Sequence, residues 1–553
     1  MVEQNFIRFY ERSFRNNWEL PALSDYFKEE GFTYGETAEE IARLHLVFEG
    51  LGIRKGDRIA LFGRNNTRWC IAFLAVVTYG AVVVPVLQDF NANDVHHILN
   101  HSGAVLLFAG DQHWDSIVPR NVEKMRAVFS LTDFSCLYER KGSHAKKVRE
   151  ELDGAFRKKY PDGFSREDVK YADVPDTEVV ELNYTSGTTG FSKGVMITGG
   201  NLANNIAFGI ASELHFPGSR ALAFLPLAHA YGCMFDFLFP LAVGTHVTLL
   251  GKIPSPKVLL EAFARVKPNI IFMVPLIIEK IYKKQILPAL ERKTIRFASK
   301  IPLLAEKIYE KINRKLVDSF GGAFSQVIIG GAPLNPEVEA FLYKIRFPFT
   351  VGYGMTECAP LISYMPYTEF VPTSCGRAIT GMEIRIDSSD PQHIPGEIVV
   401  RGKNVMKGYY KNEAATRDVL EPDGWLHTGD MGTMGEDGTL FIRGRSKSMI
   451  LTGSGQNIYP EEIESKLNNM PCVMESLVVQ RKGKLVALVY PDYEDDASGS
   501  CGSVQQLSEV MERNRQQLNR LVAPYEQITE IVLYPTEFEK TPKRSIKRYL
   551  YNV

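Results

Sequence analysis

The sequence predicts an α/β protein, with a large N-terminal domain of α/β layers, a small β-rich subdomain and a small α+β C-terminal domain. Over the first 440 residues, short apolar runs alternate with helical patterns, which is typical of a parallel sheet covered by helices. From Gly396 the segments GEIVVRG, DGWLHTGD and EDGTLFIRG instead read as short strands joined by Gly and Asp turns. The apolar runs that predict the parallel strands are Arg58 to Phe62, Val105 to Phe108, Ala221 to Leu225, His246 to Leu250, Ile270 to Val274 and Gln326 to Ile329.

We expect the domain boundary near Arg445 to Met449, because GRSKSM separates two strand-like runs and has little apolar content of its own. Residues 1–445 are then the N-terminal domain, with its β-rich part at about 375–445, and residues 446–553 the C-terminal domain. In the latter, Leu507, Met511, Leu518 and Val522 fit one face of a helix.

Composition favours an ordinary folded protein. Of 553 residues, 45% are hydrophobic and 23% are charged, which argues against disorder. Lys plus Arg is 64 and Asp plus Glu is 65, so no global field draws the chain to nucleic acid, and we expect no nucleic-acid partner.

Cysteine spacing and the N-terminus favour a cytoplasmic protein. The seven cysteines form no CxxC pair, which predicts neither a zinc site nor a disulfide framework. The first residues, MVEQNFIRFYERS, place charges where a secretory signal needs an apolar core.

One uncharged stretch, Cys70 to Leu87, passes the crude length test for a membrane span with its 18 residues. Gly80 and Pro85 interrupt it, and VVVPV is typical of a buried strand. We therefore predict a buried helix followed by a buried strand.

The most informative segment is YTSGTTGFSKGV, Tyr184 to Val195, which follows the strand-like run Glu178 to Leu182. Its hydroxyl residues and glycines can present donors to phosphate oxygens while Lys193 neutralises charge. A Walker A loop cannot be placed here, because Ser192 precedes the lysine and a glycine follows it. The bland alternative is a flexible Ser/Thr/Gly linker.

This segment resembles the phosphate-binding signature of the adenylate-forming enzymes, which include acyl-CoA synthetases, adenylation domains and firefly-type luciferases. Five further segments match that family in its order: LPLAHAYG (225–232), IIGGAPL (328–334), GYGMTE (352–357), GWLHTGD (424–430) and IRGRSKSMI (442–450). The chain is most similar to bacterial-type long-chain fatty acyl-CoA synthetases. The resemblance implies that the C-terminal domain is mobile.

The resemblance also implies the residues of an ATP site. Tyr353 offers a stacking face to adenine, Asp430 with Arg445 binds the ribose hydroxyls, and Glu357 with Thr185 holds Mg²⁺. The full implied ATP-binding set is Thr185, Ser186, Gly187, Thr188, Thr189, Gly190, Lys193, Gly331, Ala332, Pro333, Tyr353, Gly354, Met355, Thr356, Asp430, Arg445 and Gln456.

The catalytic residues implied in the same way are Lys193, His229, Thr356 and Glu357. Thr356 donates to the α-phosphate, and His229 lies beside the acyl carboxylate and the thiol entry path. Read without the family, His229 is equally a satisfied histidine at a strand end. Lys447 takes the position of the hinge between the two domains.

The C-terminal segment departs from the family pattern. Aligned with KTPxxK, the chain has Ser545 where the family has a catalytic lysine. Lys543 and Lys547 lie two residues to either side, and alternate positions of an extended strand share one face. We expect one of these two lysines to replace the missing one, and both stay open.

The resemblance implies an acid–thiol ligase that forms carbon–sulfur bonds. A carboxylic acid would react with Mg-ATP to acyl-AMP and pyrophosphate, and coenzyme A would then displace AMP. The segment VPLIIEKIYKK (274–284) favours a medium- to long-chain fatty acid. The alternatives are an acyl-carrier-protein ligase, an aryl-CoA ligase and, because of Ser545, a nucleotide-binding homologue without catalysis. We expect at most peripheral contact at the inner membrane face, and the sequence makes no prediction of the oligomeric state.

Overall fold

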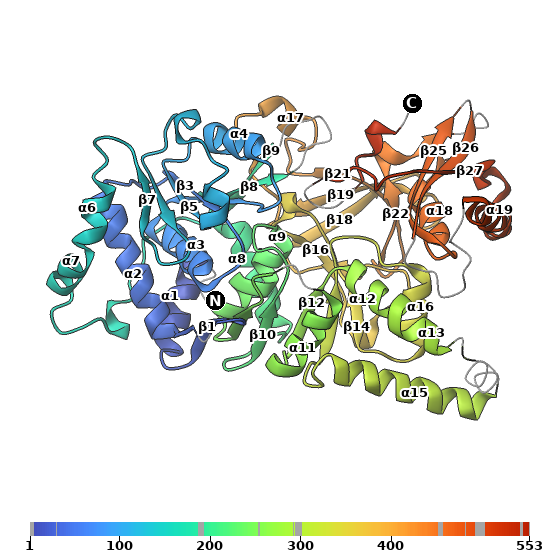
Figure 1. Ribbon diagram of the computed structural model, residues 1–553, viewed down its shortest axis with the longest axis horizontal. Helices are drawn as coiled ribbons and strands as arrows, with labels where there is room; N and C mark the ends of the chain where they lie inside the picture. The colour runs from blue at the N-terminus through green and yellow to red at the C-terminus, as the bar shows by residue number, and fades with distance from the viewer. Residues whose placement is uncertain are drawn as a thin grey trace.

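The centre of the N-terminal part is an eight-stranded sheet flanked by helices in the computed structural model (Figure 1). The structure describes residues 5–28, 30–185, 193–252, 255–290, 292, 301–451, 457–481, 483–492, 504–541 and 546–551. The strands, in spatial order, are β20 (Gly408–Tyr409), β9 (Lys193–Thr198), β8 (Val179–Thr185), β4 (Val82–Val86), β3 (Arg58–Phe62), β5 (Leu106–Ala109), β6 (Ala127–Ser130) and β7 (Cys136–Glu139). The α-helices of this part are α1 (Phe6–Asn16), α2 (Tyr34–Gly50), α3 (Thr67–Tyr79), α4 (Ala92–Ser102), α5 (Asp111–Trp114), α6 (Ala145–Glu150), α7 (Leu152–Lys159) and α8 (Gly199–Ala211).

The predicted parallel sheet is confirmed for the middle of this sheet but not for its sides. Strands β8, β4, β3, β5 and β6 run parallel, whereas β7, β9 and β20 are antiparallel to their neighbours. Only a short connection joins β8 to β9, and a short connection permits an antiparallel pair but no crossover.

The uncharged stretch from Cys70 to Leu87 is a buried helix followed by a buried strand, as predicted. Asn66 caps the start of α3 by accepting from the backbone N–H of Trp69, and Gly80 ends the helix with φ at 89°. Strand β4 then has all of its side chains buried in the middle of the sheet. Among the described helices, none combines the length and the apolar character that a membrane crossing requires.

Two smaller sheets continue the α/β pattern. In spatial order they are β10 (Arg220–Ala223), β11 (His246–Leu249), β1 (Pro21–Asp25) and β2 (Gly31–Thr33), and then β12 (Ile270–Met273), β13 (Gln326–Ile329) and β14 (Phe349–Val351). Their helices are α9 (Ala230–Gly232), the π-helix η3 (Cys233–Leu238), α10 (Phe239–Ala242), α11 (Pro256–Val266), α12 (Pro275–Ile281), the π-helix η4 (Tyr282–Ile286), α13 (Leu287–Leu290), α15 (Pro302–Ser319) and α16 (Pro336–Lys344).

The predicted β-rich segment is antiparallel throughout. It holds β17 (Arg377–Ala378) and the four-stranded sheet of β18 (Met382–Asp387), β19 (Gly396–Gly402), β21 (Leu426–Met434) and β22 (Leu440–Arg445). Strand β17 pairs with β16 (Leu361–Tyr364), which precedes the predicted segment and pairs in turn with β15 (Tyr353–Gly354). The short helix α17 (Glu413–Arg417) lies between β20 and β21 in the chain.

Asparagines of α8 join the eight-stranded sheet to the β-rich segment. The amide of Asn201 donates to the carbonyl oxygens of Lys403 and Val405, at 2.8 and 2.9 Å. These bonds hold the segment that leads into β20 against the end of β9, where the Lys407 N–H donates to the Met196 carbonyl.

A second asparagine pair extends this connection. Asn204 donates to the side-chain oxygen of Asn404 at 2.8 Å, and Asn404 donates to the carbonyl oxygen of Leu361 at 2.6 Å. The side chain of Asn404 is fully buried, so both bonds satisfy groups that water cannot reach.

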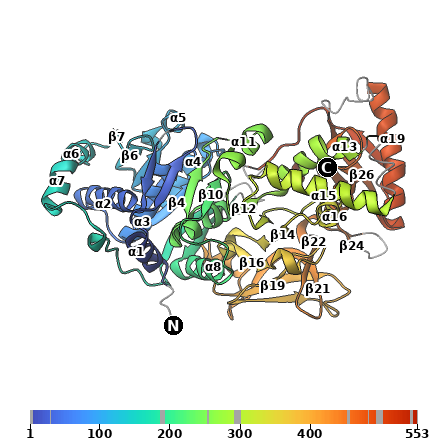
Figure 2. The same ribbon diagram turned by 90° about the horizontal axis from the view of Figure 1, so that it is seen from below.

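The C-terminal part has cores of its own. It contains β23 (Ile450–Leu451), β24 (Asn457–Ile458), α18 (Pro460–Leu467), β25 (Val473–Arg481), β26 (Lys484–Pro491), α19 (Val504–Leu521) and β27 (Glu530–Leu533). Leu507, Met511 and Leu518 are buried in one of these cores and Val522 packs at its edge, which confirms the predicted helix face. Figures 1 and 2 show this part at the end of the molecule opposite α6 and α7.

Side chains on both sides connect the C-terminal part to the rest. Asn335, which caps the start of α16, exchanges hydrogen bonds of 2.6 and 3.0 Å with Asn469, which follows α18. The Lys283 ammonium group donates to the carbonyl oxygen of Asn468.

The prediction that the chain has no disulfide framework is wrong at one cysteine. Cys70, Cys136, Cys233, Cys358 and Cys375 are free, whereas Cys472, just before β25, is disulfide-bonded. Spacing along the chain detects only short-range pairs, and a long-range pairing leaves no such signal.

We predict that Asn404→Ala lowers the free energy of unfolding by about 2 to 4 kcal/mol, because it leaves buried partners at Leu361 and Asn204 without their bonds. Urea titration of both proteins measures the difference. Asn93→Ala on the exposed face of α4 is the control and should change stability by less than about 0.5 kcal/mol. Equal stability of the two variants would contradict a structural role for the pair.

Candidate functional site

The candidate site begins where β8 ends. Thr185 is the last residue of β8 and pairs across the sheet with Lys193, the first residue of β9. The predicted phosphate-binding residues between them, Ser186, Gly187, Thr188, Thr189 and Gly190, lie outside the described residues. The structure therefore places both ends of the segment, and the carboxyl ends of parallel strands are the usual ligand-binding edge of such sheets.

Tyr409 connects two of the predicted catalytic residues. The ammonium nitrogen of Lys193 lies 4.8 Å from the centre of the Tyr409 ring, and the Tyr409 hydroxyl donates to Glu357 Oε1 at 2.9 Å. Burial and the nearby Glu357 carboxylate raise the pKa of Tyr409, so its hydroxyl keeps its proton and remains a donor. Lys193 and Glu357 are thus brought together through one ring.

The sequence analysis missed Tyr409, although the residue lies inside the predicted β-rich part at about 375–445. Its role arises from the antiparallel pairing of β20 with β9, in which Tyr409 lies opposite Val195. No local pattern indicates that pairing, since the two strands are more than 200 residues apart.

The predicted GYGMTE residues form a tight turn beside Glu357. Gly354 is required there, because a Cβ atom at this position would lie 2.3 Å from the carbonyl oxygen of Pro360. Met355 and the buried Thr356 follow it, and Thr356 begins the short 3-10 helix η5 (Thr356–Cys358), which carries Glu357. The backbone oxygen of Glu357 accepts from the N–H of Met406 at 2.8 Å, so the segment before β20 also positions this turn.

Asp430 is held from two sides. Its carboxylate accepts from the Tyr353 hydroxyl at 2.6 Å and pairs with Arg445 Nε at 2.8 Å. Asp430 and Arg445 are register partners on β21 and β22, whereas Tyr353 comes from β15. The structure therefore brings together the three residues predicted to bind adenine and ribose, and the stacking role of Tyr353 stays a prediction.

Burial sets the electrostatics of this group. It raises the pKa of Asp430, and the Arg445 guanidinium together with the Tyr353 hydroxyl oppose that rise. Burial and Asp430 in turn raise the pKa of Tyr353, which stays a neutral donor. A buried carboxylate with fixed donors is suited to accept hydrogen bonds from a pair of neighbouring hydroxyl groups.

His229 lies just before α9, on a turn that contacts β8. The Asn183 amide donates to the Ala228 carbonyl at 3.4 Å and to Glu181 Oε1 at 2.8 Å. Burial raises the pKa of Glu181 to about 7. His229 is half-buried on the α9 side of β8, and its predicted role beside the acyl group stays a prediction.

The LPLAHAYG and IIGGAPL segments touch each other. The Tyr231 hydroxyl donates to the Ile328 carbonyl at 2.9 Å, and a Cβ atom at Gly330 would lie 3.3 Å from the Tyr231 ring. Gly331 continues this close turn with φ at 85°, and the predicted adenine-pocket residues Ala332 and Pro333 are exposed beyond it.

The structure does not place every predicted residue at the site. Lys447 is exposed in the 3-10 turn η7 (Ser446–Ser448) that connects β22 with β23. Lys547 pairs with Glu539 at 3.4 Å, in a segment whose Ile546 and Tyr551 pack on the C-terminal core. Gln456, Lys543 and Ser545 lie outside the described residues.

The oxygen atoms that could bind a metal ion at the site suit Mg²⁺ better than a transition metal. Within the described part of the chain, no cluster of three or more His, Cys, Asp or Glu side chains could hold a metal ion. Mg²⁺ commonly takes one or two protein carboxylates and fills its shell with water and substrate phosphates. Glu357 near the end of β8 meets that requirement, with the Thr185 hydroxyl as a second candidate oxygen.

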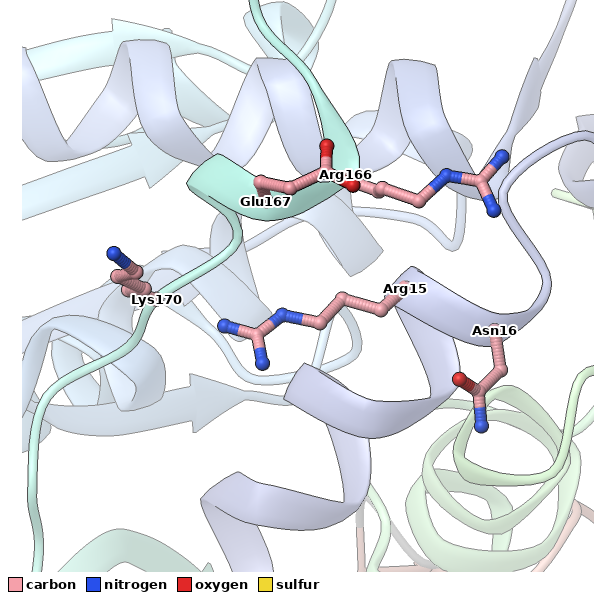
Figure 3. A pocket seen from close by; sticks show the side chains of 5 residues that line it. All are labelled: Arg15, Asn16, Arg166, Glu167 and Lys170. Carbon is pink, nitrogen blue, oxygen red and sulfur yellow. The ribbon is translucent and has the colours of Figure 1, made fainter.

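A cavity of about 520 Å³ lies elsewhere, between the end of α1 and the 3-10 helix η2 (Arg166–Asp168). Figure 3 shows Arg15 extending toward Lys170, whereas the Arg166 guanidinium points the other way. Arg15 already pairs with Glu11 at 2.9 Å and donates to the Val169 carbonyl. Arg15 therefore serves local contacts, and none of the residues that line the cavity belongs to the site at β8.

Comparison with known proteins gives a family and close relatives. The family model described as AMP-binding enzyme matches residues 10–410. The long-chain-fatty-acid–CoA ligase FadD15 of Mycobacterium bovis is 29% identical, over 93% of this chain and 89% of that protein. The peroxisomal long chain acyl-CoA synthetase 7 of Arabidopsis thaliana is also 29% identical, over 84% of this chain and 69% of that protein.

Solved structures share the fold over the whole chain. ATP-bound MatB from Rhodopseudomonas palustris has a TM-score of 0.75 and 22% identity, covering 99% of this chain and 98% of its own. The anthranilate CoA ligase AuaEII in complex with anthranoyl-AMP has a TM-score of 0.76 and 19% identity, covering 99% and 96%. The predicted α/β architecture is confirmed by this likeness.

We predict that Arg445→Ala lowers the free energy of unfolding by about 1 kcal/mol at neutral pH, a modest value because the arginine itself is largely exposed. Without Arg445 the folded-state pKa of Asp430 rises further. A carboxyl group whose pKa is higher in the folded than in the unfolded protein makes its full contribution to the free energy of unfolding below the unfolded-state pKa. That contribution is lost as the pH rises through the folded-state pKa.

The deficit should therefore be small at about pH 4 and larger at about pH 7.5, which urea titrations at both values measure. Arg443→Ala, an exposed arginine of the same strand, is the control. A deficit that grows toward acid pH would contradict the assignment.

Proposed function

Because this chain belongs to the AMP-binding enzyme family, we propose that it activates a carboxylic acid with ATP and transfers the acyl group to coenzyme A. The products are acyl-CoA, AMP and pyrophosphate. The observation that carries the proposal is the convergence of Tyr353, Asp430 and Arg445 beside the Lys193–Tyr409–Glu357 group, at the carboxyl ends of the parallel strands. ATP bound to a protein of the same fold supports the nucleotide assignment.

The acid is a medium- to long-chain fatty acid in this proposal. Relatives named as long-chain-fatty-acid–CoA ligases and long chain acyl-CoA synthetases cover most of the chain, and they support both the acyl class and coenzyme A as the acceptor. The sequence analysis left an acyl carrier protein and an aryl acid as alternatives, and the assay below separates them.

The first half-reaction joins the acid to AMP. A carboxylate oxygen of the acid attacks the α-phosphorus, a new oxygen–phosphorus bond forms, and the bond to pyrophosphate breaks. Two anions approach each other in this step, so fixed positive charge lowers its barrier. Lys193 supplies one such charge, and the Tyr409 ring holds its ammonium group on the side of Glu357.

The nucleotide is oriented by the β-rich segment. Asp430 accepts from the ribose hydroxyls while Arg445 and Tyr353 keep its carboxylate fixed, and Thr356 donates to the α-phosphate. Glu357 and Thr185 would hold Mg²⁺, which neutralises charge on the phosphate oxygens when it is bound.

The second half-reaction transfers the acyl group. The thiolate of coenzyme A attacks the acyl carbonyl carbon, a carbon–sulfur bond forms, and AMP leaves with the electron pair of the broken anhydride bond. We place His229 beside the acyl group in this step, since its turn contacts β8 through Asn183.

We also propose that the chain divides into domains 1–445 and 446–553 and that Lys447 is the hinge between them. Ile442 packs on the N-terminal core, Ile450 packs on the C-terminal core, and the exposed turn η7 lies between them. Rotation about this turn would change which C-terminal residues face the site between the half-reactions. The proposed location is cytoplasmic, with at most peripheral contact at the inner membrane face.

ATP–pyrophosphate exchange tests the proposed function. With Mg²⁺ present, we expect exchange with C8 and C16 fatty acids to exceed that with acetate or benzoate by about tenfold or more, since each buried methylene adds about 0.8 kcal/mol. Chelation of Mg²⁺ with EDTA should abolish the exchange.

The acceptor is measured in the same preparation, by acyl-CoA formation with coenzyme A and acyl transfer to a carrier protein. Highest exchange with benzoate would support the aryl-acid alternative. ATP binding without exchange for any of the acids would support a homologue that has lost catalysis.

A further prediction concerns the lysine that takes over the role of the family lysine, in whose place this chain has Ser545. Either Lys543→Ala or Lys547→Ala should lower the rate of acyl-adenylate formation about 100-fold, while transfer from preformed acyl-AMP to coenzyme A stays near the wild-type rate. Lys540→Ala is the matched control, because that lysine pairs with Glu475 and Glu537 within the C-terminal part. Full adenylation activity in both single variants and the double variant would rule out this replacement.

A further inference from the structure

His427 lies between two carboxylates on the β-rich sheet. Its Nδ1 is 2.9 Å from Glu397 Oε2, and its Nε2 is 2.8 Å from Glu421 Oε1. All three side chains are partly buried, with 29 to 36% of each exposed. Both ring nitrogens therefore face an acceptor, an arrangement that the doubly protonated imidazolium satisfies and the neutral ring does not.

Glu397 uses its second oxygen to hold the turn before Asp430. Its Oε1 accepts from the backbone N–H of Gly429 at 3.0 Å. The pairing of β19 with β21 shifts register between Glu397 and Val399, which produces a bulge in the sheet. At this bulge the Glu397 carboxylate, and not a backbone carbonyl of β19, accepts the hydrogen bond from Gly429. Gly429 adopts φ at 72°, and such a bulge redirects the side chain that follows it.

The other side of the bulge is fixed by Thr428. Its hydroxyl donates to the Ile398 carbonyl at 2.7 Å and accepts from the N–H of Asp430 at 3.1 Å. The direction of the Asp430 carboxylate, toward Tyr353 and Arg445, thus depends on contacts at both residues before it.

We propose that His427 is a positioning residue for nucleotide binding, which orients Glu397 so that Glu397 holds the Gly429 turn and thereby aims Asp430 at the ribose. The assignment rests on the proposed function, since Asp430 is the ribose-binding residue of that function. His427 itself does not touch the substrate and acts through Glu397.

The charges around His427 make this positioning dependent on pH. Hydrogen bonding to Glu397, and then to Glu421, raises the pKa of His427 above its ordinary value of about 6.5. Arg385, on β18, lies 3.9 Å from Glu421. The guanidinium groups of Arg385 and Arg401 each lie over the Trp425 ring. The two carboxylates face the ring directly and favour its protonated form, whereas the arginines disfavour it.

The sign of the pH effect follows from that direction. The imidazolium holds both carboxylates at pH values below the folded pKa of His427. As the pH rises through this pKa, one nitrogen loses its proton and repels a carboxylate, and nucleotide affinity should fall.

Equilibrium binding of AMP, measured by calorimetry from about pH 6 to about pH 9 without acid or coenzyme A, tests the proposal. We expect His427→Gln to weaken AMP binding about tenfold at about pH 6, since it removes a charge-assisted hydrogen bond to Glu397. The variant should also lack the wild-type step, which is the fall in AMP affinity as the pH rises through the pKa of His427. The phosphate of AMP titrates alike with every protein, so the difference from the wild type isolates His427.

Glu421→Gln is the second variant. It removes the outer carboxylate but keeps Glu397, so AMP should bind nearly as in the wild type at the acid end and the step should move to lower pH. His393→Gln is the matched control. His393 also contacts a carboxylate, Asp390 at 3.0 Å, but it lies in the exposed connection between β18 and β19. It should leave both affinity and step unchanged.

In turnover, His427→Gln should raise the KM for ATP and leave kcat within about twofold, because the ring positions the nucleotide and touches no reacting atom. A His427→Gln protein with wild-type affinity and pH profile would overturn the proposal. If that variant does not fold, an unshifted step in Glu421→Gln overturns it. AMP binding without acyl-CoA formation would instead overturn only the proposed function.

Discussion

The pairing of β20 with β9 is the constraint on which the rest of the site depends. It brings the two-residue strand Gly408–Tyr409 beside the strand that begins with Lys193, and so places one phenol ring between a lysine and a glutamate from distant parts of the chain. The asparagines of α8 secure this pairing by binding the carbonyl groups of the preceding segment. Because the Asn201 side chain is buried, its amide depends on these carbonyl acceptors, and the connection is both stabilising and specific.

A second theme is how the structure handles buried negative charge. Asp430 is almost fully buried, and its cost is offset by a phenol, a guanidinium and the backbone geometry of a bulge. Two more carboxylates, Glu397 and Glu421, share one histidine a short distance along β21. The sheet therefore carries a series of hydrogen-bonded contacts that runs from His427 through Glu397 and the Gly429 N–H to the turn that bears Asp430.

Much of the fold could be predicted from the sequence, because buried parallel strands leave continuous apolar runs. Gln326 to Ile329 is β13 and Arg58 to Phe62 is β3, with identical bounds, and the helix–strand reading of Cys70 to Leu87 holds. The antiparallel sides of the large sheet and the disulfide at Cys472 were not predicted. Both depend on contacts between segments that local periodicity does not connect.

The sequence by itself determined which chemistry the chain can carry, since Lys193, Glu357, Asp430 and Arg445 stand in motifs whose residue types suit phosphate, metal and ribose. Only the tertiary structure decided which of these residues act together. Tyr409 became part of the site through a strand pairing, and His427 gained its two carboxylates through a register shift and a neighbouring loop. The reason is physical: a motif records what a side chain can donate or accept, whereas its partner is set by long-range packing that brings distant backbone together.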